Sequence, residues 1–257
     1  MLRSLVLLTS GLAMFGCADT QVQRIGSVIA IKRADTEAYK TLCTDMPDAV
    51  SDAMADASIS KYSVYLGARE HETDQYYLFR HFEYTGKDLA ADISGLISDE
   101  RAADWWTRAA AVQTPLPTAP EDETWSDWEL VFYTPGAKSD RTDYTRHGAI
   151  IGLRPEPENI IAYTQLHLAT WPGVLAAIAR GNIKDFSIYH GQIEVGTHML
   201  FYHFEYVGDD FKRDMESIGK DKITQVWWTY TDPLQIRLPN VEKDGQWTTI
   251  PEVHHVR

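Results

Sequence analysis

One histidine in this chain of 257 residues stands in a setting that suits proton transfer. It is His167, which ends the segment Tyr163-Thr-Gln-Leu-His and is followed by Trp171-Pro172. Residues four apart share one face of a helix, so Tyr163 and His167 are expected to project together. An imidazole titrates near neutral pH and can act as a general acid or base. The adjacent pair Trp227-Trp228 offers indole faces that suit the C–H groups of a sugar.

The segments that must position these residues occur twice. Arg24-Ile-Gly-Ser-Val-Ile-Ala-Ile is matched 122 residues later by Arg146-His-Gly-Ala-Ile-Ile-Gly-Leu. Phe79-Arg-His-Phe-Glu-Tyr is matched at the same offset by Phe201-Tyr-His-Phe-Glu-Tyr. Several matches in one order and near one offset indicate a tandem duplication, here of residues 22–135 and 145–257. The linker is expected at about 134–145, where proline, glycine and charged residues interrupt the periodicity.

Each copy predicts the element order β-α-β-β-α-β. In the first copy, the apolar run 28–31 predicts a strand and 35–57 a helix, and the second copy repeats them at 150–153 and 158–179. An alternating strand, a helix with the Trp pair and a last strand follow. This is a ferredoxin-like α+β arrangement, with helices on one face of an antiparallel sheet. The bare sheet faces of the two copies are expected to meet in a dimeric-type α+β barrel within one chain, which predicts a monomer.

These motifs resemble the L-rhamnose mutarotase family, once per copy and over nearly the whole chain. The family motif has a tyrosine, a histidine four residues on, Trp-Pro, a Tyr-x-Ile-Tyr strand and a Trp-Trp pair. The strand reads Phe186-Ser-Ile-Tyr189 here, so one hydroxyl is missing, which bears on the identity of the sugar. The resemblance implies that His167 is the catalytic acid/base, that Tyr163, Phe186, Trp227 and Trp228 bind the sugar, and that no cofactor is needed.

The first copy departs from this motif at its central residue. Tyr39, Tyr62, Trp105 and Trp106 match, but the histidine position holds Cys43. A thiol with a pKa near 8.5 is a poor substitute for an imidazole. We therefore expect the first site to be degenerate, either catalytically weak or limited to binding.

Two further histidines recur on the strand face that is expected to line the barrel. His81 precedes Glu83 by two residues, and His203 precedes Glu205 in the same way, so each pair shares a strand face. They are either additional acid/base and sugar-binding groups, with His203 among the substrate-binding residues, or buried ion pairs. The remaining histidines considered, which are expected at the surface or at strand ends, are His190, His198, His254 and His255. No spacing predicts a zinc site, and no glycine-rich loop predicts a phosphate site.

The N-terminus predicts export. Residues 1–17 combine Arg3, a short apolar run and Gly16-Cys17, which is typical of a lipoprotein signal that ends at a lipidated Cys17. The absence of an aspartate directly after Cys17 favours the outer membrane, with the protein facing the periplasm. A net charge of −13 argues against a nucleic-acid partner.

The function expected from these features is anomer interconversion of a 6-deoxyhexose such as L-rhamnose, with a free monosaccharide as partner and no metal. Two alternatives stay open. One is a non-catalytic carbohydrate-binding lipoprotein of the envelope. The other is a different α+β barrel enzyme, such as a cofactor-free monooxygenase, since a fold does not fix a function.

Overall fold

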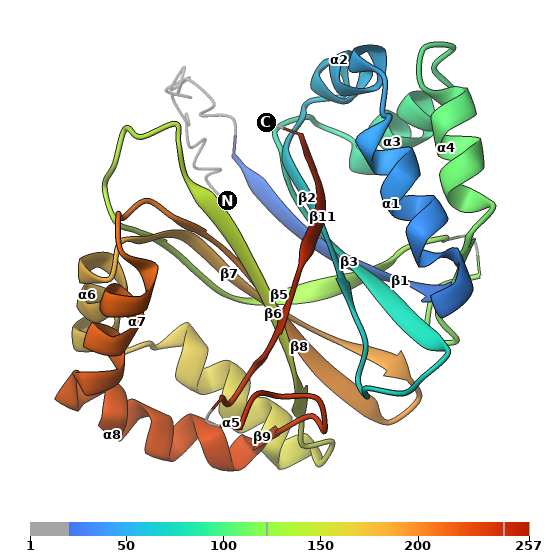
Figure 1. The fold of residues 1–257 in the computed structure, drawn as a ribbon. Helices are drawn as coiled ribbons and strands as arrows, with labels where there is room; N and C mark the ends of the chain where they lie inside the picture. Colours follow the sequence, from blue (N-terminus) through green and yellow to red (C-terminus); the bar gives the residue numbers. More distant parts are fainter. Residues whose placement is uncertain (1–20, 122, 244, 257) are drawn as a thin grey trace, which may run out of the picture.

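The first repeat alternates long strands with pairs of short helices (Figure 1). The computed structural model describes residues 21–121, 123–243 and 245–256. The elements of the first repeat are β1 (Gln23–Lys32), η1 (Arg33–Asp35), α1 (Thr36–Thr44), α2 (Asp48–Asp56), β2 (Ile59–Gly67), β3 (Gln75–Tyr84), α3 (Leu89–Ser98), α4 (Ala103–Ala110), β4 (Gln113–Thr114) and β5 (Ser126–Gly136).

The second repeat follows the same order. Its elements are β6 (Thr145–Leu153), α5 (Pro157–Leu168), α6 (Pro172–Arg180), β7 (Ile183–Glu194), β8 (Thr197–Tyr206), α7 (Phe211–Lys220), α8 (Lys222–Thr231), η2 (Asp232–Leu234), β9 (Gln235–Ile236), β10 (Thr248–Ile250) and β11 (Glu252–Val256). The prediction of one helix at each helical position was wrong, because each is a pair of helices. Pro47 precedes α2 and Pro172 begins α6, and a proline cannot continue a preceding helix without loss of a hydrogen bond.

The last strand of each repeat is shared with the other repeat. The sheet order is β10-β6-β8-β7-β5-β1-β3-β2-β11, and neighbouring strands in this order pair antiparallel. β5 pairs with β1 through residues 126–128 and with β7 through 129–136. β10 pairs with β6, and β11, which follows after Pro251, pairs with β2. The two ends of the sheet are therefore joined by one stretch of chain, which confirms the α+β barrel within a single chain.

The barrel interior is filled by large side chains from both repeats. Glycines make room for them at two equivalent positions in β1 and β6. A Cβ on Gly26 would lie 2.3 Å from the Tyr189 ring, and one on Gly148 would lie 2.5 Å from the Tyr65 ring. Each tyrosine ring therefore packs directly on the backbone of the opposite repeat.

Three apolar clusters hold the layers together. One fills the barrel, and the other two lie between the sheet and the helices of each repeat. Figure 1 shows α1–α4 on one side of the molecule and α5–α8 on the other. The predicted alternation along β3 is confirmed, because Phe79 belongs to the barrel cluster and Leu78 and Phe82 to the helix-side cluster.

The predicted signal segment and Cys17 lie outside the described residues. Within the described ranges, none of the helices is long and apolar enough to cross a bilayer.

Candidate active site

A cavity of about 720 Å³ lies in the second repeat, between the sheet and its helices. Five of the residues expected at the site line it, namely Tyr163, His167, Phe186, Trp227 and Trp228. The structure thus brings together side chains from α5, β7 and α8. The volume falls within the range of roughly 300–1,000 Å³ that is usual for small-molecule sites.

The last turn of α5 presents His167. Pro157 begins this helix at a position where the missing N–H costs no hydrogen bond, and Tyr163 packs into the core one turn before His167. The two rings stack with centroids 4.1 Å apart. Phe132 of β5 and Trp227 of α8 contact the imidazole edge-on, at 5.7 and 5.6 Å. Aromatic rings on three sides therefore fix the orientation of the imidazole.

The Trp-Pro motif supports the site from behind. Pro172 starts α6, and Trp171 caps this helix in an extended backbone conformation. The Trp171 ring contacts Trp227 at 5.4 Å and Tyr230 at 5.7 Å. Trp171 does not line the cavity but holds Trp227 in place. Trp228 lines the cavity and is 38% exposed to solvent.

The sheet supplies the floor of the cavity. Phe186 contacts Phe132, Tyr202 and Phe204 edge-on at 5.4–5.5 Å. Tyr202, which the sequence reasoning did not single out, also lines the cavity, and burial raises the pKa of its hydroxyl. Tyr202 therefore carries a hydroxyl next to Phe186, the position where the family motif has a tyrosine.

The protonation state of His167 follows from its contacts. Its Nδ1–H donates to the backbone carbonyl of Tyr163 at 2.9 Å, which leaves the lone pair on Nε2. Nε2 has no hydrogen-bond partner among the described residues. Burial lowers the pKa of His167 to about 4, against a smaller opposing effect of the Tyr163 carbonyl. At neutral pH the ring is therefore an unprotonated base.

A carboxylate that the sequence reasoning missed lies in the same cavity. Asp232 follows α8, and it is the only acidic residue among the described lining residues. Burial raises its pKa, and its charge in turn raises the pKa of Tyr163. Comparison of the repeats could have indicated it, because 122 residues earlier the first copy has Ala110. The first copy thus lacks both the histidine and the carboxylate.

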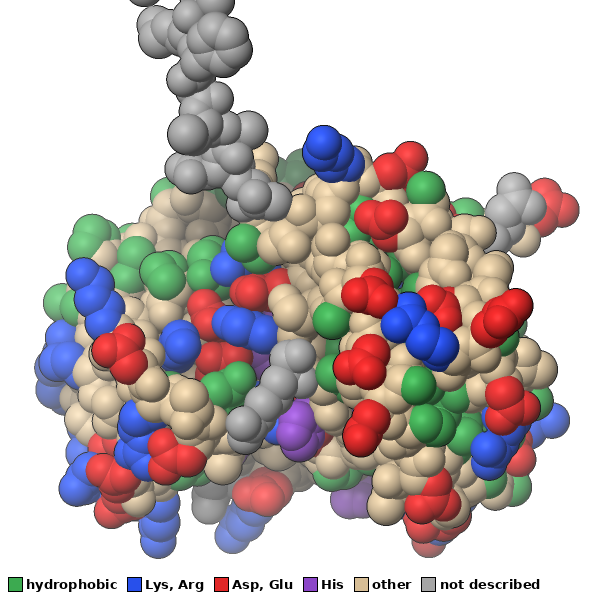
Figure 2. All heavy atoms as spheres, turned by 90° about the horizontal axis from the view of Figure 1, so that it is seen from above, with side chains coloured by type: hydrophobic (Ala, Val, Ile, Leu, Met, Phe, Trp, Pro, Cys, Tyr) green, Lys and Arg blue, Asp and Glu red, His purple; other side chains and the backbone are tan. Residues whose placement is uncertain are grey.

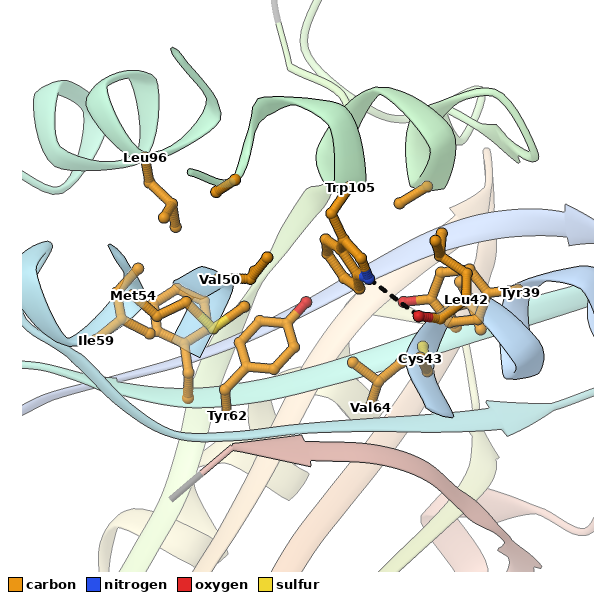
Figure 3. Close-up of a cluster of buried hydrophobic side chains, with 14 of the residues drawn as sticks. Tyr39, Leu42, Cys43, Val50, Met54, Ile59, Tyr62, Val64, Leu96 and Trp105 are labelled. Atoms are coloured by element: carbon orange, nitrogen blue, oxygen red, sulfur yellow. Dashed lines mark hydrogen bonds between the residues drawn. The ribbon is translucent and has the colours of Figure 1, made fainter. Parts of the chain in front are cut away.

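The equivalent space in the first repeat is packed with side chains (Figure 3). Tyr39, Cys43 and Tyr62 are buried there, and the indole N–H of Trp105 donates to the Leu42 carbonyl at 3.1 Å. Burial raises the pKa of the Cys43 thiol to about 12. The thiol is therefore protonated at neutral pH.

His203 and His81 lie inside the barrel instead of at the cavity. Their rings stack face to face with centroids 3.9 Å apart. His203 Nδ1 shares a hydrogen bond with the Tyr65 hydroxyl at 2.7 Å, and His81 Nδ1 shares one with the Tyr189 hydroxyl at 2.8 Å. Burial lowers the pKa of His81 to about 3. The structure therefore brings His203 to a histidine–tyrosine cluster between the repeats and not to Trp227.

The glutamates of the two His-x-Glu pairs join an ionic cluster at the barrel end. Lys61 lies 2.5 Å from Asp185, 3.6 Å from Glu83 and 3.5 Å from Glu205. Burial alone would lower the pKa of Lys61, but these carboxylates raise it. Figure 2 looks onto this end, where red and blue side chains meet between the two halves. Glu83 and Glu205 are thus ion-paired, although not with the histidines.

Lys61 and Asp185 occupy the same position in the two repeats. They lie 124 residues apart, both have a left-handed backbone, with φ of 50° and 47°, and both sit at an irregularity in the strand pairing. The approximate twofold axis between the repeats therefore passes close to this ion pair. Among the described residues, no group of three or more His, Cys, Asp or Glu side chains is arranged to hold a metal ion.

Comparisons with known proteins agree with the repeat structure. A family model described as L-rhamnose mutarotase matches residues 24–134 and again residues 146–256. A curated L-rhamnose mutarotase from Bacteroides thetaiotaomicron is 28% identical over 95 residues, which cover 37% of this chain and 83% of that protein.

Two solved structures resemble the whole double repeat. A putative monooxygenase from Lactobacillus acidophilus has a TM-score of 0.53 over 91% of this chain and 95% of its own. Another from Fusobacterium nucleatum has a TM-score of 0.50 over 91% and 93%. Both are 10% identical to this chain, so the likeness concerns the fold alone.

Proposed function

Because the chain belongs to the L-rhamnose mutarotase family, we propose that it interconverts the α and β anomers of a 6-deoxyhexose such as L-rhamnose. The second repeat carries this activity. The observation that supports it most directly is the state of His167, whose unprotonated Nε2 has no partner among the described residues and stands in a cavity walled by Trp227 and Trp228.

Mutarotation needs one group that accepts a proton and one that donates a proton. In the proposed mechanism, His167 Nε2 takes the proton of the anomeric hydroxyl while Asp232 gives a proton to the ring oxygen from its protonated form, which its raised pKa favours. The bond between the anomeric carbon and the ring oxygen breaks, which leaves an open-chain aldehyde, an imidazolium and a carboxylate.

Ring closure returns both groups to their starting state. The aldehyde turns about the adjacent C–C bond and presents its other face to the former ring hydroxyl. Asp232 then takes back the proton of that hydroxyl, and the His167 imidazolium protonates the new anomeric oxygen. No proton is gained or lost overall, and proton transfer by such a pair is worth roughly 10²–10⁴-fold in rate.

The aromatic walls bind the sugar during this exchange. Indole and phenol rings pack against the apolar faces of a pyranose, and Tyr163 and Tyr202 are among the residues that line the cavity. The methyl group of a 6-deoxy sugar suits the apolar floor around Phe186.

Anomer exchange measured by NMR saturation transfer tests the proposal. L-Rhamnose, L-fucose and further free sugars are compared with a soluble form that begins at Gln21. Exchange above the spontaneous rate is expected, with a loss of about 10²-fold or more in His167→Ala and in Asp232→Asn. His71→Ala is the matched control, since His71 is exposed and far along the chain from the cavity residues.

The outcomes separate the candidate functions. Exchange that persists in His167→Ala would refute the assignment of the base. Binding of sugar without any exchange by the unaltered protein would leave a carbohydrate-binding protein, the alternative that the missing hydroxyl at Phe186 favours.

We also propose that the protein is anchored to the cell envelope through lipid on Cys17 and faces the periplasm. The support is the signal-like sequence of residues 1–17. Mass spectrometry of the membrane fraction should find a diacylglyceryl-modified N-terminal cysteine. In Cys17→Ala the protein should leave the membrane fraction, and an unmodified membrane-free wild type would refute the anchor.

A further inference from the structure

The exchanged strands place one residue of each repeat beside the site of the other. β5 of the first repeat brings Phe132 to the second repeat, where it pairs with Ile188 of β7. β11 of the second repeat brings His254 to the first, where it pairs with Val64 of β2. Phe132 and His254 are 122 residues apart and are therefore counterparts. His254 was expected at the surface or at a strand end. It occupies the position equivalent to Phe132, which contacts His167 in the second repeat.

The histidine that faces the first tryptophan comes from a different element in each repeat. In the second repeat it comes from the helix, as His167, at 5.6 Å from Trp227. In the first repeat the helix position is Cys43, and the imidazole comes from the exchanged strand, as His254, at 6.0 Å from the equivalent Trp105. Each repeat therefore sets one histidine against the first tryptophan of its Trp-Trp pair.

One buried polar atom of His254 has no hydrogen-bond partner among the described residues. It is the ring nitrogen Nε2. Tyr62 packs against the His254 ring, with ring centroids 6.1 Å apart. Figure 3 shows Tyr62 pointing from β2 toward Trp105 and Val50, within the packed cluster. Buried polar groups are normally paired, so the unpaired Nε2 marks a place where a ligand or water completes it.

A smaller cavity of about 330 Å³ opens beside His254, outside the packed cluster that contains Tyr62 and Trp105. Cys43 and His254 line it, and the carboxylates of Asp48 and Glu252 and the hydroxyl of Ser51 form its polar wall. Carboxylates and hydroxyls accept hydrogen bonds from the hydroxyls of a sugar. The volume lies at the small end of the usual range for ligand sites, which suits a single small molecule.

We propose that the first repeat holds a second, separate binding site for a monosaccharide, in which His254 from the exchanged strand replaces the helix histidine. The choice of a monosaccharide rests on the function proposed for the second repeat. The site is expected to bind without turnover, because the Cys43 thiol that takes the place of the helix histidine stays protonated. Burial lowers the pKa of His254 to about 4, so its ring is neutral at neutral pH.

Histidine side-chain NMR on the soluble form tests this site. The Cε1–H signals of His254 and His167 are assigned from His254→Phe and His167→Ala, and L-rhamnose is titrated. Phenylalanine is the residue that the counterpart position already holds. Both signals are expected to move, with two different dissociation constants. In Ser51→Ala, which removes one hydroxyl of the cavity wall only, the His254 curve should weaken by about three- to tenfold while the His167 curve stays unchanged.

Two outcomes would overturn the proposal. The first is a His254 signal that stays still when the His167 site is saturated. The second is a His254 curve that coincides with that of His167 and is unaffected by Ser51→Ala, because the signal would then report the second repeat. Anomer exchange is measured separately on the same samples. A protein without exchange but with two binding curves would refute the proposed activity and keep the second site.

Discussion

Acidification provides a direct test of the electrostatics at His167. A ring whose pKa is about 4 is about 97% neutral at pH 5.5, whereas a ring at the ordinary value of 6.5 is about 9% neutral there. The two cases differ about tenfold in the concentration of the base. The cause is burial among Tyr163, Phe132 and Trp227, which disfavours the charged imidazolium.

The titration is read from the Cε1–H signal that disappears in His167→Ala. In the folded protein its midpoint is expected near pH 4, and in urea-unfolded protein near the ordinary value of about 6.5. Protein-dependent exchange should accordingly not fall between pH 7.5 and 5.5. Acidification also favours the protonated form of Asp232, so the rate should stay level or rise.

A midpoint near 6.5 in the folded protein would refute the reasoning, because burial would then fail to hold the ring neutral. A tenfold fall in exchange by pH 5.5 would refute it as well. Spontaneous mutarotation, measured at each pH without protein, is subtracted in both cases.

Three stability predictions follow, each read from urea unfolding midpoints. The pKa of His81 is about 3 in the fold and about 6.5 when unfolded, so the unfolded chain binds the proton first and stability is lost as the pH falls from 6.5 toward 3. At pH 5 His81 should lower the free energy of unfolding by about 2 kcal/mol relative to pH 7.5. A urea midpoint that does not change between these pH values would contradict the burial of a neutral ring. Lys61→Met removes the cation shared by three carboxylates, of which Glu83 keeps Arg24 and Glu205 keeps Lys184, and should cost about 1–3 kcal/mol. Lys40→Met, in an exposed pair, should cost less than about 1 kcal/mol. Gly26→Ala forces a methyl group into a tyrosine ring and should cost about 1–3 kcal/mol or more, whereas Gly95→Ala, in an open helical position, should stabilise by up to about 1; equal effects of the two would be inconsistent with the packing described.

The repeats explain why much of the fold could be predicted from sequence. Two aligned copies reveal which residues alternate, and the strand with Phe79 and His81 showed its inner face in both. Helix breaks were missed because the apolar spacing continues across Pro47 and Pro172. The sequence pattern reports which face of a helix is buried, but a proline changes the direction of the chain without interrupting that pattern.

The candidate site was predictable where residues lie close along the chain. Tyr163 and His167 are one helical turn apart, so their stacking followed from spacing alone. Asp232 was missed because it reaches the cavity of the second repeat from a turn after α8. His254 was missed because it reaches the first repeat on a strand exchanged from the second. The exchanged strand pairs His254 with Val64, which lies 190 positions earlier, and only tertiary packing determines such a contact.

The ion pair between Lys61 and Asp185 has a consequence for how repeats of this kind can assemble. If two second repeats met in the same arrangement, Asp185 would face another Asp185 beside two copies of Glu205, and two first repeats would set Lys61 against Lys61. The opposite charges at the axis therefore favour contact between unlike repeats. Within one chain they favour pairing of the two halves with each other over pairing of either half with a copy of itself.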